Sequence, residues 1–269
     1  MNKKEFKEHW KILTDSFKLK ADFLYIFFYD LLLYGIMIPL FSLFIFILNK
    51  KAEAVDPNIL SNLNSVMNIT AAQAQQIQQA SQAVQSYLYT FLGAGLLFII
   101  IALLAFTLTR ALIWNHLLKK KFELKKYLKF NLLILLLAFL AVILYIILRI
   151  IAPLIINIFL KISINFALIL SSILYLLVFM AIIYFASLIY INHTKTGKIF
   201  NSFSKTFRLI KTKFQKISIS YLFIFLVSII VVLIAMLRWL LPYYLQMYFN
   251  YAVVLSFLAW MRIYITSVK

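Results

Sequence analysis

Asp30 is the residue of this chain that is best placed to carry out chemistry. It lies inside a long apolar stretch that begins at Ala21, and a carboxylate there needs a partner, a proton or water because its burial is costly. Its depth is about eight residues, or roughly 12 Å of helix, which Arg110 can reach from the inner end of the next apolar stretch. We therefore expect an Asp30–Arg110 ion pair that fixes the packing of two membrane helices. A proton or cation relay through Asp30 is the alternative.

The three histidines form a second candidate set. His9, His116 and His193 are all expected near the inner membrane interface, and an asparagine precedes the second and the third. Three imidazoles are enough to bind zinc. An Asn-His pair at a polar, wet helix end also has a simpler role, in which Asn caps the helix and His meets the negative end of its dipole. We expect this simpler role and no metal site.

Gln246 and Asn250 are polar residues inside the last apolar stretch. Because they are four residues apart, they share one helix face. At that place they either make hydrogen bonds between helices or line a polar path. We expect the hydrogen bonds, with the polar path as the alternative.

The sequence contains no motif of a known catalytic centre. It has eight Asp or Glu residues, four glycines and no cysteine. It lacks the HExxH zinc helix, the glycine-rich nucleotide loop and the GxSxG nucleophile elbow. We therefore predict a non-enzymatic protein without catalytic, cofactor-binding or metal-ligating residues.

Six apolar stretches must position these polar residues. Of the 269 residues, 65% are hydrophobic and 13% are charged, an apolar load that excludes a soluble protein. Each stretch is near or above the ~20 residues that a bilayer crossing requires. The six are Ala21–Leu48, Leu88–Trp114, Leu128–Leu148, Ile164–Ile191, Ile217–Leu237 and Leu245–Ile265. The predicted fold class is an all-α membrane protein with six transmembrane helices arranged as three hairpins.

The distribution of Lys and Arg predicts the orientation of these crossings. Five of the 27 basic residues fall on one side, namely Lys50, Lys51, Arg149, Lys161 and Arg238. The remaining 22 (27 minus 5) fall in the alternate segments or at the adjoining ends of the crossings. By the positive-inside rule those segments and both termini are cytoplasmic. The same rule accounts for the net charge of +19 without nucleic acid as a partner, and we expect a location in the plasma membrane.

A basic segment precedes each predicted hairpin, with helical periodicity that is clear in the first and last and shorter and less regular in the second, which carries Leu118, Phe122, Leu124 and Leu128. The last of these segments carries apolar residues at spacings of 3 and 4, namely Phe200, Phe203, Phe207, Ile210 and Phe214. The first repeats the pattern with Phe6, Trp10, Leu13 and Phe17. Such a pattern is typical of an amphipathic helix in the membrane interface. We predict that anionic lipid headgroups contact Lys119, Lys120, Lys121, Lys205, Arg208, Lys211, Lys213 and Lys216.

Short sequence matches ahead of alternate crossings indicate a three-fold repeat in a single membrane domain. Its units are 1–116, 117–193 and 194–269, and the first is longer because of an extracytoplasmic insertion at 49–87. From Thr70 the insertion is rich in Ala and Gln, and its spacing predicts a helix that runs into the second crossing. A narrow apolar stripe on this helix favours packing onto Leu60, Leu63 and Met67. Pairing with a second copy of the chain is the alternative.

The basic segment before the first crossing, the Asn-His ends and the Lys-Thr-Gly-Lys-Ile-Phe run at 195–200 together resemble uncharacterised archaeal six-span membrane proteins. The layout is also similar, more distantly, to the membrane domain joined to some glycerophosphodiester phosphodiesterases. The resemblance implies the six-span fold and no activity, because the metal-binding carboxylates of those enzymes belong to a separate soluble domain.

Two functions fit these patterns. The first is a membrane scaffold or organiser whose basic helices bind anionic lipid or a partner, which is a membrane protein or a second copy of the chain. The second is a transporter or permease subunit with a polar path past Asp30 and a separate energy-coupling partner. The first uses the stronger features of the sequence, and we expect it.

Overall fold

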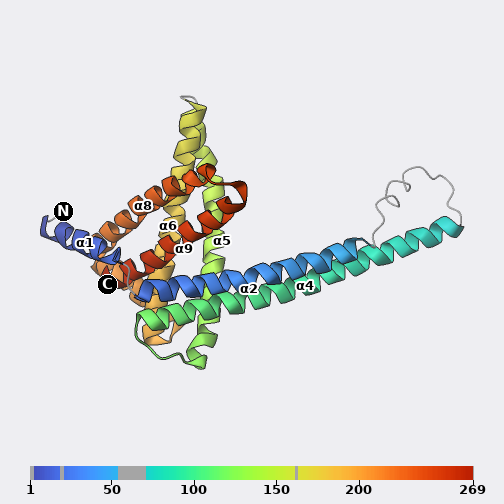
Figure 1. The fold of residues 1–269 in the computed structure, drawn as a ribbon, viewed down its shortest axis with the longest axis horizontal. Helices are drawn as coiled ribbons and strands as arrows, with labels where there is room; N and C mark the ends of the chain where they lie inside the picture. Colours follow the sequence, from blue (N-terminus) through green and yellow to red (C-terminus); the bar gives the residue numbers. More distant parts are fainter. Residues whose placement is uncertain (1–2, 19–20, 54–70, 161–162, 269) are drawn as a thin grey trace. The chain divides into compact units, whose positions relative to one another are not determined.

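The computed structural model describes residues 3–18, 21–53, 71–160 and 163–268, and every regular element that these residues form is a helix. Figure 1 shows these helices coloured along the chain. In chain order they are α1 (Lys3–Ser16), α2 (Ala21–Ala52), α4 (Ala71–Leu117), α5 (Leu124–Leu160), α6 (Ile164–Thr196), α7 (Ile199–Thr212), α8 (Phe214–Met236), the short 3₁₀ helix η2 (Leu237–Leu240) and α9 (Tyr243–Val268).

Six of the described helices are long and apolar enough to cross a membrane, namely α2, α4, α5, α6, α8 and α9. Each contains one of the six apolar stretches predicted from the sequence, although Leu237 at the end of the fifth stretch already belongs to η2. The prediction of an all-α protein with six membrane-length helices is therefore confirmed. Such a set of helices is that of a multi-pass membrane protein.

The chain divides into two compact units, of which one comprises residues 32–106. Within this unit, α2 and α4 pack through aromatic rings, and Phe44 stacks on Phe98 at 5.3 Å between centroids. Because α4 begins at Ala71 and continues to Leu117, the predicted helix that runs from the insertion into the second crossing is confirmed. The predicted packing partners of that helix, Leu60, Leu63 and Met67, lie outside the described residues.

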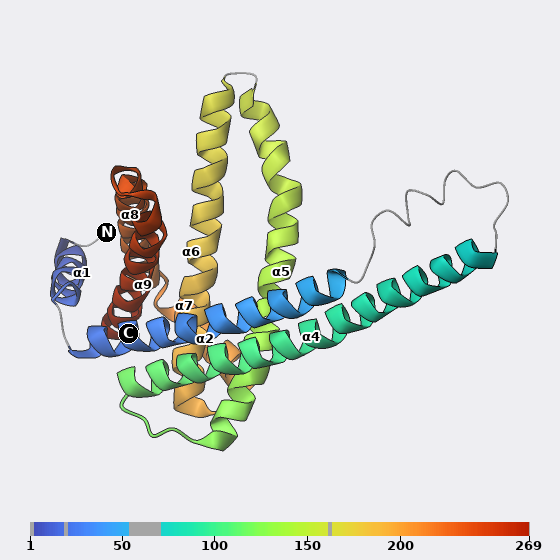
Figure 2. The same ribbon diagram turned by 45° about the vertical axis from the view of Figure 1, so that its right-hand side comes forward.

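The other unit comprises residues 1–31 and 107–269, and the second half of α9 forms much of its core. Ten residues between Leu255 and Val268 are buried there. In the same unit, α5 and α6 lie side by side and antiparallel (Figure 2), and α8 packs against α9. A long apolar helix needs such neighbours for any polar side chain that it carries, so α9 is the element most able to hold a buried charge.

The N-terminal helix α1 packs against α9 and α8. Leu13 of α1 is buried, and the ring of Phe17, the residue after α1, stacks on Trp260 at 4.9 Å. Trp10 lies 6.0 Å from Phe223 of α8 between ring centroids. Three residues of the predicted interfacial stripe therefore contact other helices of the protein.

The turn between α6 and α7 depends on a glycine. Gly197 has φ = 65°, a left-handed conformation that ends α6, and its N–H donates to the carbonyl of His193 at 2.7 Å. A Cβ atom at this position would lie 3.3 Å from the side chain of Lys126. The side chain of Lys126 in α5 therefore lies beside the end of α6, and the basic segments at 119–129 and 195–216 lie at the same end of these two helices.

Candidate functional site

A cluster of three buried charged side chains lies in the unit of residues 1–31 and 107–269. Asp30 of α2 is completely buried, and Arg110 of α4 and Arg262 of α9 are almost so. Nη1 of Arg110 donates to Oδ1 of Asp30, and Nη1 of Arg262 donates to Oδ2 at 2.5 Å. The structure thus contains the predicted Asp30–Arg110 ion pair and adds a second arginine. One carboxylate joins three membrane-length helices.

Apolar side chains one turn away support this charge cluster. Ile26, Ile113 and Ala259 are each fully buried and pack together, four, three and three residues from Asp30, Arg110 and Arg262 respectively. In a helix such spacings place a residue on the same face, one turn along. The three helices that carry the charges therefore also contribute to one apolar cluster a turn away.

The cluster holds more positive than negative charge, because two guanidinium groups share one carboxylate. The ring of Tyr190 of α6 lies 6.2 Å from that of Trp114, which is one turn from Arg110 on α4, so a fourth helix lies beside the cluster. Since both carboxylate oxygens already accept a charged hydrogen bond, the arrangement is that of a structural joint. The alternative prediction, a proton or cation relay through Asp30, requires an acid group that is open to a mobile ion.

Arg262 was not predicted as a member of this site. It is the charged residue of the sixth apolar stretch, Leu245–Ile265, but a basic residue near the inner end of a crossing is also what the positive-inside rule produces. The depth of Arg262 in its crossing was the signal that could have assigned it to the cluster. Like Arg110, Arg262 lies a few residues from the end of its crossing that the sequence predicts to be the inner one, within reach of Asp30.

The two histidines with described side chains have different environments. The ring of His116 stacks on Tyr25 at 3.7 Å between centroids, and its Nε2 atom lies 2.9 Å from Oδ1 of Asp22. His193 is buried, and neither of its ring nitrogens has a hydrogen-bond partner. The prediction of a wet helix end is therefore wrong for His193, because the start of α5 covers it with the ring of Phe130, 5.6 Å away.

In the described part of the chain, no three His, Asp or Glu side chains come together in a group that could hold a metal ion. The side chain of His9 lies outside the described residues. Asn192 has a connecting role between helices in place of the predicted cap: its Nδ2 atom donates to Oγ1 of Thr206 at 2.7 Å.

Gln246 and Asn250 lie far from the charge cluster along α9. Sixteen positions separate Gln246 from Arg262, which is about 24 Å of helix. Nε2 of Gln246 donates to the carbonyl of Leu241 at 3.1 Å, so it holds the turn before its own helix and no other crossing. Oδ1 of Asn250 is buried without a hydrogen-bond partner. The structure therefore does not join these amides and Asp30 into one polar site.

The basic helix α7 forms the second candidate site. Small polar residues on one of its faces, Ser202 and Thr206, are buried against α6. Oγ1 of Thr196 lies 3.2 Å from Oγ of Ser202, and Thr206 accepts the bond from Asn192. In contrast, Phe200 is 84% exposed and Phe207 is 59% exposed. We call the Ser202–Thr206 face the docking seam of α7.

The basic residues predicted to meet lipid headgroups lie at the surface. Seven of them are exposed and Lys216 is half-buried; the seven are Lys119, Lys120, Lys121, Lys205, Arg208, Lys211 and Lys213. Nearby, Glu123 pairs with Lys126 at 2.5 Å.

No protein family matches this chain, and no characterised protein or solved structure with significant similarity to it was found. The expected resemblance to phosphodiesterase membrane domains therefore stays an expectation.

Proposed function

We propose that this chain is a non-enzymatic multi-pass membrane protein that binds anionic lipid headgroups at the cytoplasmic face of the plasma membrane and so organises lipid or a partner. In this proposal the six crossings form three hairpins and both termini are cytoplasmic. The basic helices α1 and α7 precede the first and the third hairpin, whereas the predicted helix before the second is wrong, because residues 118–123 form no helix between α4 and α5. The observation that carries the proposal is the orientation of α7. This helix is held by a polar seam, whereas Phe200, Phe207 and the basic residues of α7 are exposed.

The geometry of α7 divides its surface into three faces. At the 100° per residue of an α-helix, Phe200, Phe203 and Phe207 lie about 100° around the axis from the docking seam. The basic residues Lys205, Arg208 and Lys211 occupy the remaining side. A helix in the membrane interface needs an apolar face for the acyl chains and basic residues for the phosphates. With the seam packed on α6, the basic face stays exposed. On the apolar face Phe200 and Phe207 are exposed, although the ring of Phe207 also lies 5.4 Å from that of Phe185 of α6.

The number of basic residues gives the expected strength of the interaction. A basic residue close to an anionic membrane surface contributes about 1 kcal/mol, and salt screens this attraction. Lys205, Arg208, Lys211 and Lys213 lie on or directly after α7, and Lys119, Lys120 and Lys121 lie in the preceding basic segment. Together they favour a preference for anionic over zwitterionic lipid that weakens at high salt.

The permease alternative receives less support. It needs polar residues that line one continuous path, whereas both oxygens of Asp30 are engaged by arginines and Gln246 bonds to Leu241. Gln246 lies sixteen positions along α9 from Arg262, the residue that joins this helix to Asp30. We therefore retain lipid binding as the proposed function.

The test is the lipid preference of a variant without the basic face of α7. Lys205, Arg208, Lys211 and Lys213 are replaced together by Gln, and the protein is equilibrated with equal amounts of phosphatidylglycerol and phosphatidylcholine. Native mass spectrometry then counts the lipids that stay bound. We expect the wild type to enrich phosphatidylglycerol and the variant to lose this enrichment.

A matched control removes the same number of charges from the opposite side. It replaces Lys50, Lys51, Arg149 and Arg238 by Gln, four of the five basic residues assigned to the outer side. This control variant is expected to keep the enrichment. Equal enrichment in the wild type and the α7 variant would refute the proposal.

A further inference from the structure

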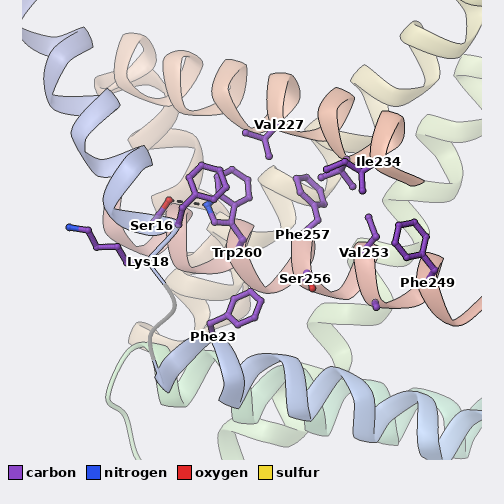
Figure 3. A pocket seen from close by; sticks show the side chains of 13 residues that line it. Ser16, Lys18, Phe23, Val227, Ile234, Phe249, Val253, Ser256, Phe257 and Trp260 are labelled. Carbon is purple, nitrogen blue, oxygen red and sulfur yellow. Dashed lines mark hydrogen bonds between the residues drawn. The ribbon is translucent and has the colours of Figure 1, made fainter. Parts of the chain in front are cut away.

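An apolar groove lies between α8 and α9, and residues at the end of α1 and just after it line one of its ends. Its volume is about 440 Å³, within the range of roughly 300–1,000 Å³ that ligand pockets usually have. The side chains that line it are mainly apolar and include Val227 and Ile234 of α8 and Phe249, Val253 and Phe257 of α9 (Figure 3). We call this cavity the α8–α9 groove.

The length of the groove corresponds to one leaflet of a bilayer. Phe249 lines one end of it and Trp260 the other (Figure 3), and these residues are eleven positions apart on α9, or about 17 Å of helix. The hydrocarbon core of a bilayer is about 30 Å thick. Because α8 and α9 are both membrane-length helices, the groove has the depth of a single hydrocarbon chain that enters from one face of the membrane.

The Trp260 end of the groove is its polar end. Nε1 of Trp260 donates to Oγ of Ser16 at 2.9 Å, and Ser16 in turn donates to the carbonyl of Leu13, so the polar atoms of this wall are paired. The side chain of Lys18 also lines the groove here, while its amino group points away from the apolar interior (Figure 3). That amino group lies 2.6 Å from Oδ1 of Asp15 and is largely exposed. A basic residue in this place suits a phosphate group at the mouth of the groove.

We propose that the α8–α9 groove binds one hydrocarbon chain of a membrane phospholipid, with the phosphate of that lipid beside Lys18. Apolar lining along one leaflet depth and a cation at one mouth match the two parts of such a molecule. The inference rests on the proposed function in one respect, because both place Lys18 at the cytoplasmic face of the membrane. The groove does not include α7, so the two proposals can fail independently.

The experiment uses phosphatidylglycerol with a photoreactive diazirine in one acyl chain, added as a minor component to phosphatidylcholine vesicles that contain the full-length protein. After irradiation, mass spectrometry of peptides locates the adducts. We expect adducts concentrated at Val227–Ile234 and Phe249–Phe257. An even spread over exposed residues of other helices, such as Phe139 and Val142 of α5, would overturn the proposal.

Groove-filling variants make the test specific. Ala252→Phe places a ring inside the groove and is expected to remove most of the adduct, and Ser256→Leu serves as a second, smaller filler. Val254→Phe adds a ring to α9 two positions away, on the opposite face, and is expected to leave the adduct unchanged. Equal unfolding temperatures show that the variants fold. Undiminished labelling in both fillers, or a groove occupied by a cross-linked second copy, would overturn the proposal.

Lys18 is tested with the same probe. We expect Lys18→Gln to lower the adduct yield by up to about fivefold, which corresponds to roughly 1 kcal/mol for one basic residue near anionic lipid. Lys7→Gln on α1 is the matched control and is expected to have no effect. If the four-residue α7 variant keeps the groove adduct but loses its lipid preference, the two sites are separate. If labelling of the groove is unaffected by Lys18→Gln, the assignment of the phosphate to Lys18 is wrong.

Discussion

At the scale of single residues, Asp30 is the group on which three helices depend. Replacing Asp30 by Asn keeps its shape but removes the negative charge between Arg110 and Arg262. Removal of one partner from a buried ion pair costs about 3–5 kcal/mol, and in a chain of this size this lowers the unfolding temperature on the order of 10 °C. Thermal unfolding of the purified protein in detergent measures the effect.

The control for this prediction is Arg262→Met, which leaves one carboxylate with one guanidinium group. Its cost is expected to be smaller than that of Asp30→Asn, because the charges that remain are balanced. An Asp30→Asn variant as stable as the wild type, or less damaged than Arg262→Met, would contradict the structural role of the cluster.

The residues of this cluster were predictable to different degrees. Asp30 and Arg110 stand out in the sequence because each is a charge inside an apolar stretch, at depths that the long arginine side chain can bridge. Arg262 has the same property, but the positive-inside rule already explains a basic residue at that end of a crossing. His193 was predicted to be wet because an Asn-His pair looks like a helix end. Its burial depends on Phe130 of another helix, which no local pattern reports.

At the scale of elements, the docking of α7 depends on two small polar side chains. Thr206→Val keeps the shape of the side chain and removes the hydroxyl that accepts from Asn192. Loss of one partner of a buried hydrogen bond costs roughly 1–3 kcal/mol, so we expect the amides of residues 199–212 to exchange hydrogen faster. The exchange rates of α8 are expected to stay unchanged. Hydrogen exchange with mass spectrometry compares the two helices directly.

Thr212→Val is the matched control for this prediction. Thr212 is exposed, and its hydroxyl bonds to the carbonyls of Arg208 and Leu209 in its own helix. Exchange in α7 is expected to change little. Equal acceleration in both variants would mean that the docking seam contributes nothing specific to the position of α7.

The positions of the helices were predictable to a much larger extent than their faces. Length and hydropathy alone mark a membrane crossing, since the bilayer imposes both, and α2, α6 and α9 begin within two residues of the predicted stretches. The face by which α7 packs was not predictable. Ser202 and Thr206 give no hydropathy signal, and the aromatic stripe beside them dominates the pattern.

At the scale of the whole molecule, local sequence patterns do not reveal which helix packs against which. The stripe of Leu13 and Phe17 is equally typical of a helix on the membrane surface and of a helix packed on protein. In the structure α1 contacts α8 and α9, because Trp260 offers both a ring for Phe17 and a donor for Ser16. Such long-range pairs, more than 240 residues apart, leave no periodic trace in the chain.

The orientation across the membrane is the property of the whole chain that charge alone predicts, and a cysteine-free sequence makes it measurable. Single cysteines are introduced at Ser204, an exposed residue of α7, and at Gln82, an exposed residue of α4 in the predicted outer insertion. Intact cells are then treated with a maleimide that does not cross membranes. Since 22 of the 27 basic residues lie on the side of Ser204, we expect Gln82→Cys to react and Ser204→Cys to react only after the cells are opened. The reverse pattern would place α7 and the mouth of the α8–α9 groove outside, where both proposed lipid contacts would have to be abandoned or reassigned to the outer leaflet.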